Sequence, residues 1–428
     1  MAAALRMREE PSMARALGGG APAPGRQTVP LNPACALLRE SRDVLLLQGP
    51  VGPFFDRLAR WLERRATRVT RIVLQGGDRH DARAGHVVPY EGAPGEWASF
   101  LREFLRTRRP DCIVLFGQSR GYHQEALRLA AELGIPAVVL EEGYFRPGYV
   151  TMELGGVNSH SRTLETHAWA PTGGMPPGGL APDDTRWHFA QTAWHAALHY
   201  AALRLHQGAF PLYEHHRDAN PWRYARYWLR SWGVKLLRHG RDARCARSLQ
   251  RGPAPYFFVP LQHDGDSQIR HHSGYARNAE FVLEVMHSFA EHAEPGTLLV
   301  FKQHPQSRGA AGHGALIRRV ANELGIGERV RYLVEGDTRD LCRGARGVVV
   351  INSTVGLQAL ESGTPLVVMG EALYRLPSLT HGGTLHSFWR DGAPPDPEAA
   401  AAFLQQLKNL TQMPASIYAG RRQDLAWP

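Results

Sequence analysis

The sequence has few cysteines, no long apolar run and no common catalytic signature. Its four cysteines, Cys35, Cys112, Cys245 and Cys342, lie far apart and form no CxxC pair. This spacing argues against a zinc site and gives no disulfide framework, so a reducing cytoplasm is the simplest compartment. No apolar run approaches the roughly 20 residues that a membrane-spanning helix needs. The N-terminus also lacks the continuous apolar core of a signal peptide.

The absence of several short motifs narrows the chemistry further. Neither GxGxxG nor GxxxxGK[ST] occurs, so dinucleotide-binding and P-loop NTPase functions have no support. HExxH is absent too, and the histidine pairs at 215/216 and 271/272 are adjacent rather than spaced to face one metal ion. We therefore expect no catalytic metal and no cofactor.

The length and the charge of the chain point to two domains and an anionic partner. A chain of 428 residues is too long for one comfortable core. The excess of 50 Lys+Arg over 40 Asp+Glu gives a net charge of +10, which suits nucleic acid, an acidic membrane face or a phosphorylated small molecule. Because the basic residues are dispersed and no nucleic-acid recognition module is present, we expect no nucleic-acid partner.

The order of apolar runs predicts an α/β fold with two similar lobes. Runs rich in β-formers, such as DVLLLQG and DCIVLFGQS, alternate with helical runs, and a second series of this kind begins after residue 255. Such alternation predicts parallel sheets covered by helices, in two Rossmann-like domains that face a central cleft. We assign 1–35 to a disordered leader, 36–250 to the N-terminal domain, 251–395 to the C-terminal domain and 396–428 to a helical tail.

A helical insert at about 163–250 has an unusual composition. Asn220 and Pro221 suit the cap and first turn of a helix that continues as WRYARYWLRSWGVKLLRHGRDARCAR. Trp222, Leu229, Trp232 and Leu236 fall at helical spacing, while the arginines lie largely elsewhere on the helix. This pattern fits a helix that lies on an anionic bilayer. It also fits an interdomain helix with a core stripe and a solvated basic face.

Polar and acidic residues follow the predicted strands. Ligands of open α/β sheets bind outside the carboxyl ends of the strands, so these residues are candidate ligand contacts. In the first lobe they are Gln48, Gly49 and Gly52, then Gly77 and Asp78, then Glu141 and Glu142. In the second lobe they are Gln262, Asp264 and Asp266, then Lys302, His304 and Pro305, then Asn352, Ser353 and Thr354.

Each of these groups has an ordinary interpretation beside a functional one. Ser353 and Thr354 precede a helix expected near Val355, where they either hold a phosphate or simply cap the helix. His304 donates to a phosphate or ribose, or is one incidental histidine among 21. Glu141 and Glu142 are an acid/base pair with a raised pKa, or two solvated charges. Asp264 and Asp266 are turn residues or a nucleophile facing the first lobe.

The wording and order of several motifs resemble a known family. LLLQGPVGPFFDRLARWL, LQGGDRH, VVLEEGYFRPGYVTMELGGVN, VPLQHDGDSQIR, VFKQHPQSRG and VVVINSTVGLQALESGTPLVVMG are similar to the bacterial capsule polysaccharide biosynthesis and export family, KpsS/LipB type, from about residue 43 to about 380. The resemblance implies a GT-B fold and a β-Kdo transferase that uses CMP-Kdo. It also implies transfer of the first Kdo of a poly-Kdo linker to lysophosphatidylglycerol, at the cytoplasmic face of the inner membrane.

The resemblance further implies roles for individual residues. The donor contacts with CMP are expected at His304, Pro305, Lys302, Ser353, Thr354, Asn352 and Gln262. Asp266 is expected to be the nucleophile of a retaining reaction, and the acid/base falls on Glu142, slightly preferred, or Glu141. The acceptor and cleft residues are expected to be Gln48, Gly49, Gly52, Gly77, Asp78 and Arg146.

Three further expectations follow from the resemblance and the motifs. The protein is expected to be peripheral on the inner membrane, with other capsule synthesis and export proteins as further partners. The insert is where acceptor choice would lie. An inverting sialyltransferase-like enzyme and a non-catalytic export or scaffold protein stay open as alternatives.

Overall fold

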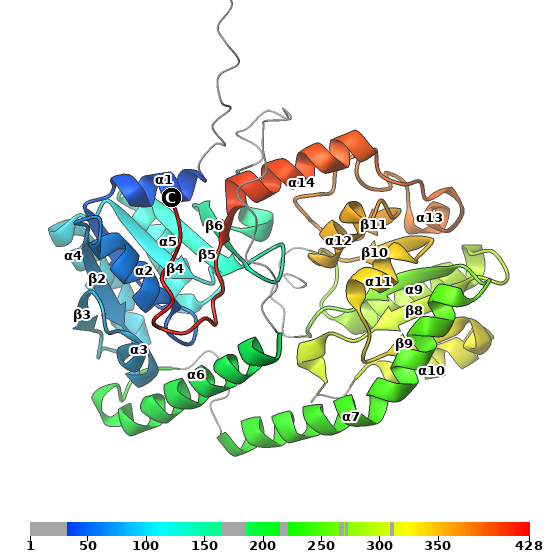
Figure 1. Ribbon diagram of the computed structural model, residues 1–428, viewed down its shortest axis with the longest axis horizontal. Coiled ribbons are helices and arrows are strands. Elements are labelled where there is room, and N and C mark those ends of the chain that lie inside the picture. Colours follow the sequence, from blue (N-terminus) through cyan, green and yellow to red (C-terminus); the bar gives the residue numbers. More distant parts are fainter. Residues whose placement is uncertain (1–31, 164–184, 215–220, 265–268, 270–272, 309–311) are drawn as a thin grey trace, which may run out of the picture.

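The computed structural model describes residues 32–163, 185–214, 221–264, 269, 273–308 and 312–428. Within these residues the chain forms two α/β lobes that lie side by side (Figure 1). Each lobe contains a largely or wholly parallel sheet with helices packed against it. The prediction of an α/β fold with two Rossmann-like lobes is therefore confirmed.

The N-terminal lobe is built on a sheet of the order β12-β6-β5-β4-β1-β2-β3. The five strands from β5 to β3 are parallel, while β6 pairs antiparallel with β5, and β12 pairs antiparallel with β6. Its strands are β1 (Asp43–Leu46), β2 (Arg68–Val73), β3 (His86–Pro89), β4 (Cys112–Phe116), β5 (Ala137–Glu142), β6 (Tyr149–Leu154) and β12 (Gln412–Pro414). Its helices are α1 (Pro33–Glu40), α2 (Phe54–Glu63), α3 (Gly76–Asp81), α4 (Trp97–Arg108), α5 (Gly121–Glu132) and α6 (Thr185–Leu205).

The C-terminal lobe has a parallel sheet of the order β11-β10-β7-β8-β9. Its strands are β7 (Tyr256–Pro260), β8 (Leu298–Lys302), β9 (Val330–Leu333), β10 (Gly347–Val350) and β11 (Leu366–Val368). The helices are α7 (Pro221–Arg251), α9 (Asn278–His292), α10 (Gly314–Glu323), α11 (Thr338–Arg343), α12 (Val355–Glu361), α13 (Leu385–Asp391) and α14 (Pro397–Thr411). Short 3-10 turns occur at Pro94–Glu96, Asn158–His160, Gln207–Ala209, Pro305–Ser307 and Gly327–Arg329.

Each sheet separates two hydrophobic cores. Alternate residues of a strand point to opposite faces, so Val114 joins one core of the N-terminal lobe while Leu115 joins the other. Phe257 and Phe258 divide in the same way between the two cores of the C-terminal lobe. Central parallel strands buried on both faces are continuous apolar runs, which is why the sequence predicts them well.

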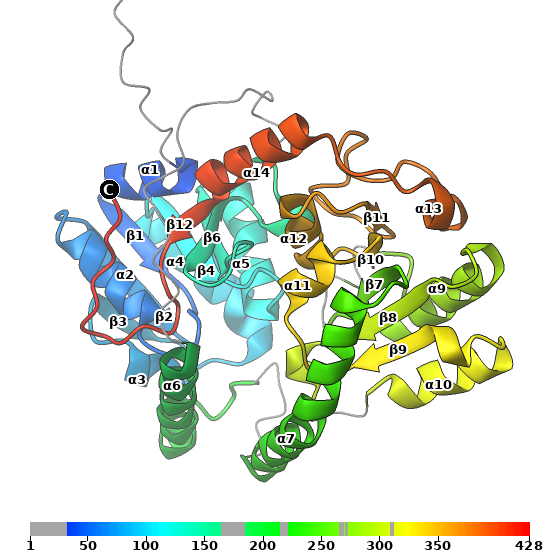
Figure 2. The same cartoon turned by 45° about the vertical axis from the view of Figure 1, so that its right-hand side comes forward.

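The C-terminal end of the chain differs from the predicted helical tail. Helix α14 ends at Thr411, and the chain then crosses back to the first lobe as strand β12 (Figure 2). Beyond it, Trp427 packs edge-on against Trp61 in the core of the N-terminal lobe. Arg57 holds this segment by donating to the carbonyl oxygens of Ser416 (2.7 Å) and Gln423 (2.5 Å). The prediction of helix over 396–428 is therefore wrong after residue 411.

Two predicted boundaries also need correction. Helix α1 begins at Pro33, inside the predicted leader 1–35, because the Asn32 side chain caps it by accepting from the amide of Cys35 at 3.0 Å. Helix α7, which lies within the predicted N-terminal domain 36–250, packs on the C-terminal lobe. Its buried Asp242 accepts from the amides of Val334 (2.8 Å) and Glu335 (3.0 Å). The insert is thus divided, with α6 on the first lobe and α7 on the second.

Candidate functional site

The strand orders locate one crevice in each lobe. Read from the edge opposite α14, the first lobe has the order β3-β2-β1-β4-β5 and the second has β9-β8-β7-β10-β11. In the first lobe the direction of the connections reverses between β1 and β4. In the second lobe it reverses between β7 and β10. Ligands of open α/β sheets bind at this point, outside the carboxyl ends of the strands. The relevant loops are those after β1 and β4, and those after β7 and β10.

In the second lobe, side chains from three loops meet at this edge. Gln262, which follows β7, donates from Nε2 to Oδ1 of Asn352 at 2.9 Å and accepts from the Asn352 amide at 3.3 Å. The ring of the adjacent His263 lies 6.3 Å, centroid to centroid, from the ring of His304, which follows β8. Gln262 and His263 therefore lie between the loops that carry Asn352 and His304.

His304 and Lys302 differ in how they are presented. His304 is half-buried, and its Nδ1 accepts from the amide of Gln306 at 3.2 Å, which orients the ring at the start of the 3-10 turn. Lys302, at the end of β8, is buried, and burial lowers the pKa of its ammonium group while Glu335 opposes this change. The ammonium group is thus largely withdrawn from solvent.

Ser353 and Thr354 lie immediately before α12, which begins at Val355. The Ser353 hydroxyl oxygen accepts from the Val355 amide at 3.2 Å, and the hydroxyl of buried Tyr374 donates to the Ser353 carbonyl. Helix α12 is only seven residues long. A phosphate at this position would be held mainly by hydroxyl and amide groups, since a short helix contributes little dipole.

The two aspartates after β7 have different surroundings. Asp266 lies outside the described residues. Asp264 accepts from the side-chain amide of Asn278 at 2.7 Å, and its Oδ1 is 3.0 Å from Nε2 of His313. These contacts bind the carboxylate of Asp264 to its own lobe, so its structural role is to hold the loop.

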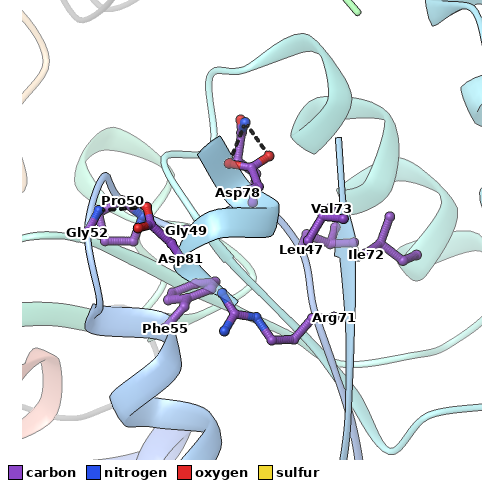
Figure 3. Close-up of a pocket in the computed structure, with 11 residues that line it drawn as sticks. Leu47, Gly49, Pro50, Gly52, Phe55, Arg71, Ile72, Val73, Asp78 and Asp81 are labelled. Atoms are coloured by element: carbon purple, nitrogen blue, oxygen red, sulfur yellow. Dashed lines mark hydrogen bonds between the residues drawn. The ribbon is translucent and has the colours of Figure 1, made fainter. Parts of the chain in front are cut away.

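In the first lobe, the equivalent edge carries a buried polar cluster. Nε2 of Gln48 donates to both carboxylate oxygens of Asp78, at 2.9 and 3.3 Å (Figure 3). Arg120, which follows β4, donates to Oε1 of Gln48 at 2.9 Å and to the carbonyl oxygen of Gly49 at 3.1 Å. Burial raises the pKa of Asp78, and His199 opposes this change.

A pocket lies beside this cluster (Figure 3). It is lined by Leu47, Gln48, Gly49, Pro50, Gly52, Phe55, Arg71, Ile72, Val73, Asp78 and Asp81. The buried guanidinium of Arg71 extends along its floor toward Asp56, whose Oδ1 is 3.5 Å from Nη1. Four of the predicted acceptor residues, Gln48, Gly49, Gly52 and Asp78, are therefore brought together around one pocket.

The glycines near this pocket allow close packing. A Cβ atom on Gly49 would lie 2.7 Å from the ring of Phe55. A Cβ on Gly77 would lie 2.6 Å from the ring of His199, which belongs to α6. Gly52 has a φ of +100° and donates its amide to Asp81 at 3.0 Å. The structure thus gives these glycines packing roles, and Gly77 is covered by α6.

Glu141 and Glu142 end β5 and point to opposite faces of the sheet. Burial and, to a smaller extent, the charge of Glu142 raise the pKa of Glu141 to about 7, while Arg120 opposes them. Glu142 forms an ion pair with Arg146, and its Oε1 accepts from the hydroxyl of Tyr418 at 2.9 Å. A carboxyl group that titrates near neutral pH suits acid/base chemistry. The surroundings therefore favour Glu141 over Glu142, the reverse of the preference drawn from the sequence.

The loop after β5 also joins the two lobes. Tyr144 and Phe145 are buried in a hydrophobic core that belongs mainly to the C-terminal lobe. Arg146 accepts at its carbonyl oxygen from Nη2 of Arg339, on α11, at 3.3 Å. Arg146 therefore lies at the contact between the lobes, and the loop after Glu142 fixes this edge of the first lobe against the second.

Sequence reasoning missed three residues of this site. Arg120 stands four positions after β4 in the run DCIVLFGQSR, so the same strand-end rule that selected Gln48 would have found it. Asp81 and His199, whose Oδ2 and Nδ1 are 2.7 Å apart, join α3 to α6. Their pairing has no local signal, because 118 residues separate them.

Within the described residues, neither a membrane-spanning helix nor a metal-binding group of side chains is found. None of the described helices is both long enough and apolar enough to cross a membrane. Among the same residues, no group of three or more His, Cys, Asp or Glu side chains is arranged to hold a metal ion.

Comparison with known proteins identifies related sequences over most of the chain. A family model described as "Capsule polysaccharide biosynthesis protein" matches residues 111–418. The chain is 37% identical to "Capsule polysaccharide export protein KpsS" of Escherichia coli over 391 residues, which cover 90% of this chain and 99% of the relative. It is 34% identical to "Capsule polysaccharide modification protein LipB" of Neisseria meningitidis serogroup B, over 92% of this chain and 96% of the relative.

A solved structure with a similar arrangement is described as "KpsC, beta Kdo 2,7 transferase" of Thermosulfurimonas dismutans. It aligns with a TM-score of 0.42 and 15% sequence identity, over 84% of this chain and 89% of that chain. The similarity of sequence confirms the resemblance to the KpsS/LipB type that the motifs indicate.

Proposed function

The chain belongs to the capsule polysaccharide biosynthesis family, and on this premise we propose that it is a retaining β-Kdo glycosyltransferase. It uses CMP-Kdo as donor and adds the first Kdo of a poly-Kdo linker to a lysophosphatidylglycerol anchor. The proposal needs no metal and no cofactor.

The observation that carries the proposal is the meeting of three loops at the crevice of the second lobe. Gln262 bonds to Asn352 on one side, and His263 lies against His304 on the other. A nucleotide bound there would lie over the amide and hydroxyl groups after β10 and the imidazole after β8. Donors of this kind stabilise a departing phosphate, whose negative charge grows in the transition state.

In the proposed reaction, the second lobe holds the donor. His304, with Pro305 fixing its turn, and the hydroxyls of Ser353 and Thr354 bind the CMP phosphate, while buried Lys302 adds positive charge from below. The carboxylate of Asp266 attacks the anomeric carbon as CMP leaves, forming a glycosyl-enzyme ester. The acceptor hydroxyl then displaces Asp266, so two inversions give net retention.

The first lobe supplies the group that accepts the proton of the acceptor hydroxyl. We assign this role to Glu141, because its raised pKa lets it take up a proton near neutral pH. Glu142, which pairs with Arg146 and Tyr418, holds the edge of the lobe in place. Gln48, Gly49, Gly52 and Asp78 surround the pocket where the acceptor headgroup is expected, and Gly77 supports α6 beside it.

The proposal places the protein on the cytoplasmic side of the inner membrane as a peripheral protein, because its acceptor is a lipid. Other capsule synthesis and export proteins are proposed as partners. A non-catalytic export role is the second candidate, and the similarity to the Escherichia coli capsule polysaccharide export protein favours it. An inverting sialyltransferase-like reaction would use the same donor edge.

The test is incubation of the purified protein with CMP-Kdo and a panel of lipid acceptors, followed by mass spectrometry. We expect one added Kdo on lysophosphatidylglycerol and release of CMP. The Asp266→Asn variant is the matched control, and it should bind CMP but transfer nothing. An α-linked product by NMR would indicate inversion, and no CMP release with any acceptor would overturn the enzyme in favour of the export role.

A further inference from the structure

The outer face of helix α6 is apolar where a surface helix is normally polar. Its exposed residues recur at helical spacing and are Ala190, Ala193, Trp194, Ala197, Ala201, Arg204 and Leu205. Trp194 is 64% exposed and Leu205 is 81% exposed. The opposite face, with His199 and Ala202, is buried against α3. Large apolar side chains exposed together on one face of a surface helix are typical of an interaction surface.

Helix α7 repeats this property on the other lobe. Leu229, Leu236 and Leu237 are 75%, 75% and 83% exposed, and Trp232 lies exposed among them. The sequence leaves open whether the apolar stripe of α7 packs into a core between the domains or lies on a bilayer. The exposure of its described side chains excludes a core. Toward the C-terminal end of the helix, the exposed positions become basic, at Arg241, Arg244, Arg247 and Arg251.

The two helices lie on the same side of the molecule. Figures 1 and 2 both show α6 below the N-terminal lobe and α7 below the C-terminal lobe. Leu212, between the two helices in the sequence, is also exposed. The two helices that carry these exposed apolar side chains therefore lie along one side of the molecule, which we call the helical platform, formed by α6 and α7.

The charged side chains of the platform are almost all basic. Helix α7 contains nine Lys and Arg residues and a single acidic residue, Asp242, which is buried and bonded to the amides of Val334 and Glu335. The sequence of α6 contains no Asp or Glu. Exposed Leu and Trp side chains flanked by Arg and Lys, without exposed acid, are typical of helices that bind anionic bilayers in the plane of the interface.

We infer that α6 and α7 together form a membrane-binding platform, one helix from each lobe, that docks on the surface of an anionic phospholipid bilayer. The inference rests on the proposed function for the presence of a lipid acceptor, while the surface itself is argued from the two helices. Trp194, Leu205, Leu229 and Leu236 enter the headgroup region, and the arginines of α7 bind lipid phosphates. A second copy of this chain fits the platform poorly, since two strongly basic α7 helices would repel one another.

The test is co-sedimentation of the full-length protein with vesicles of phosphatidylcholine alone or containing 30% phosphatidylglycerol (a composition of about one anionic lipid in three). Two variants remove the apolar contacts of each helix separately: Trp194→Ser with Leu205→Ser on α6, and Leu229→Ser with Leu236→Ser on α7. The matched control is Leu283→Ser, an exposed leucine on α9.

We expect the wild-type protein to bind the anionic vesicles, and to do so more weakly as salt is raised. Each apolar double variant should lower the partition coefficient by about tenfold or more. Replacing Arg244 and Arg247 by Gln should lower it by about fivefold for each charge. Replacing Arg318 and Arg319, exposed on α10, should have little effect and serves as the charge-matched control.

Several outcomes would overturn the inference. One is equal binding to neutral and anionic vesicles, and another is unchanged binding when either helix alone is altered. A third is a dimeric wild-type protein whose platform variants are monomeric and which binds no vesicle, because a second copy would then cover the platform.

The inference and the proposed function can fail separately. Transfer to a short-chain lysophosphatidylglycerol analogue, dissolved below its micelle concentration, does not require vesicle binding. Platform variants should therefore keep wild-type transfer to that soluble acceptor. Vesicle binding without any transfer would support the membrane-binding platform and refute the transferase function. Transfer to the soluble acceptor without vesicle binding would support the transferase function and refute the platform.

Discussion

Replacing Glu141 by Gln tests whether this carboxyl group has the raised pKa on which the acid/base assignment depends. In the folded protein burial moves the pKa from 4.5 to about 7, with Glu142 acting in the same direction and Arg120 and Arg146 against it. A carboxyl group with a raised folded pKa contributes stability that is fully present below the unfolded value. That stability is lost as the pH rises from about 4.5 to about 7.

The size of the effect follows from the two pKa values. Relative to a carboxyl group with an unshifted pKa, the raised pKa of Glu141 lowers the free energy of unfolding by about 3 kcal/mol at pH 8, but by only about 1 kcal/mol at pH 5. Glutamine cannot ionise and nearly preserves the shape of the side chain. We therefore expect Glu141→Gln to raise the free energy of unfolding by about 2 kcal/mol more at pH 8 than at pH 5. Urea unfolding at the two pH values measures this difference.

The same variant should lose activity while it gains stability. If Glu141 is the base for the acceptor hydroxyl, the wild-type transfer rate rises with pH through about 7. Glu141→Gln should then transfer about 10² to 10⁴ times more slowly. Glu142→Gln is the matched control: it should retain transfer, and because the Glu142 charge helps to raise the pKa of Glu141, its stability should depend less on pH than that of the wild type. A Glu141→Gln variant with the same change in stability at pH 5 and pH 8 would refute the raised pKa.

Three further changes test other parts of the structure. Gly77→Ala puts a methyl group 2.6 Å from the ring of His199, so it should lower the free energy of unfolding by about 1 to 3 kcal/mol. Gly95→Ala is the control, because open space surrounds Gly95, and it should not lower this free energy. Equal unfolding curves for the two variants would contradict the close packing at Gly77. Gln262→Ala removes both hydrogen bonds that join the loops after β7 and β10, and calorimetry should show CMP affinity lowered by about tenfold. Asp266→Asn should abolish transfer with CMP affinity unchanged, and near wild-type transfer would exclude it as the nucleophile.

The parts of the fold that sequence predicted best are those governed by local pattern. Strands such as β4 and β10 are buried at every position, so they are uninterrupted apolar runs between turn residues. The return of β12 to the first sheet was missed because Gln412 pairs with Thr151, 261 residues away, and three residues carry no strand pattern. The lobe to which α7 belongs was missed because the helix meets that lobe through Asp242 and Leu249 rather than through its apolar stripe, and neither residue has a local signal for one lobe.

The residues of the candidate site also fall into those that local sequence pattern predicts and those that depend on the tertiary structure. The carboxyl ends of parallel strands share one edge, so reading the residues after each strand brought Gln262, Asn352 and His304 together without coordinates. The difference between Glu141 and Glu142 could not be read, because successive residues of a strand point to opposite faces and only the tertiary structure decides which face is dry. On one face burial raises the pKa of Glu141, and on the other face Glu142 forms an ion pair with Arg146. These surroundings distinguish two glutamates that look alike in sequence.

The contact of α6 with the first lobe links the proposed lipid surface to the proposed acid/base group. Nε2 of His199 lies 2.9 Å from Nε2 of Gln75, and its Nδ1 lies 2.7 Å from Oδ2 of Asp81. From α6 a continuous chain of side-chain hydrogen bonds reaches the edge of the sheet through His199, Gln75, Asp78, Gln48 and Arg120.

Arg120, at the end of this chain, is one of the two arginines whose charge opposes the rise in the pKa of Glu141. The members of the chain from His199 to Gln48 are buried, and breaking one bond there would leave a buried polar group without its partner. A displacement of α6 must therefore carry Gln48 and Arg120 with it or break the chain at considerable cost. If α6 rests on the bilayer, the lipid surface and Glu141 are held at a fixed separation.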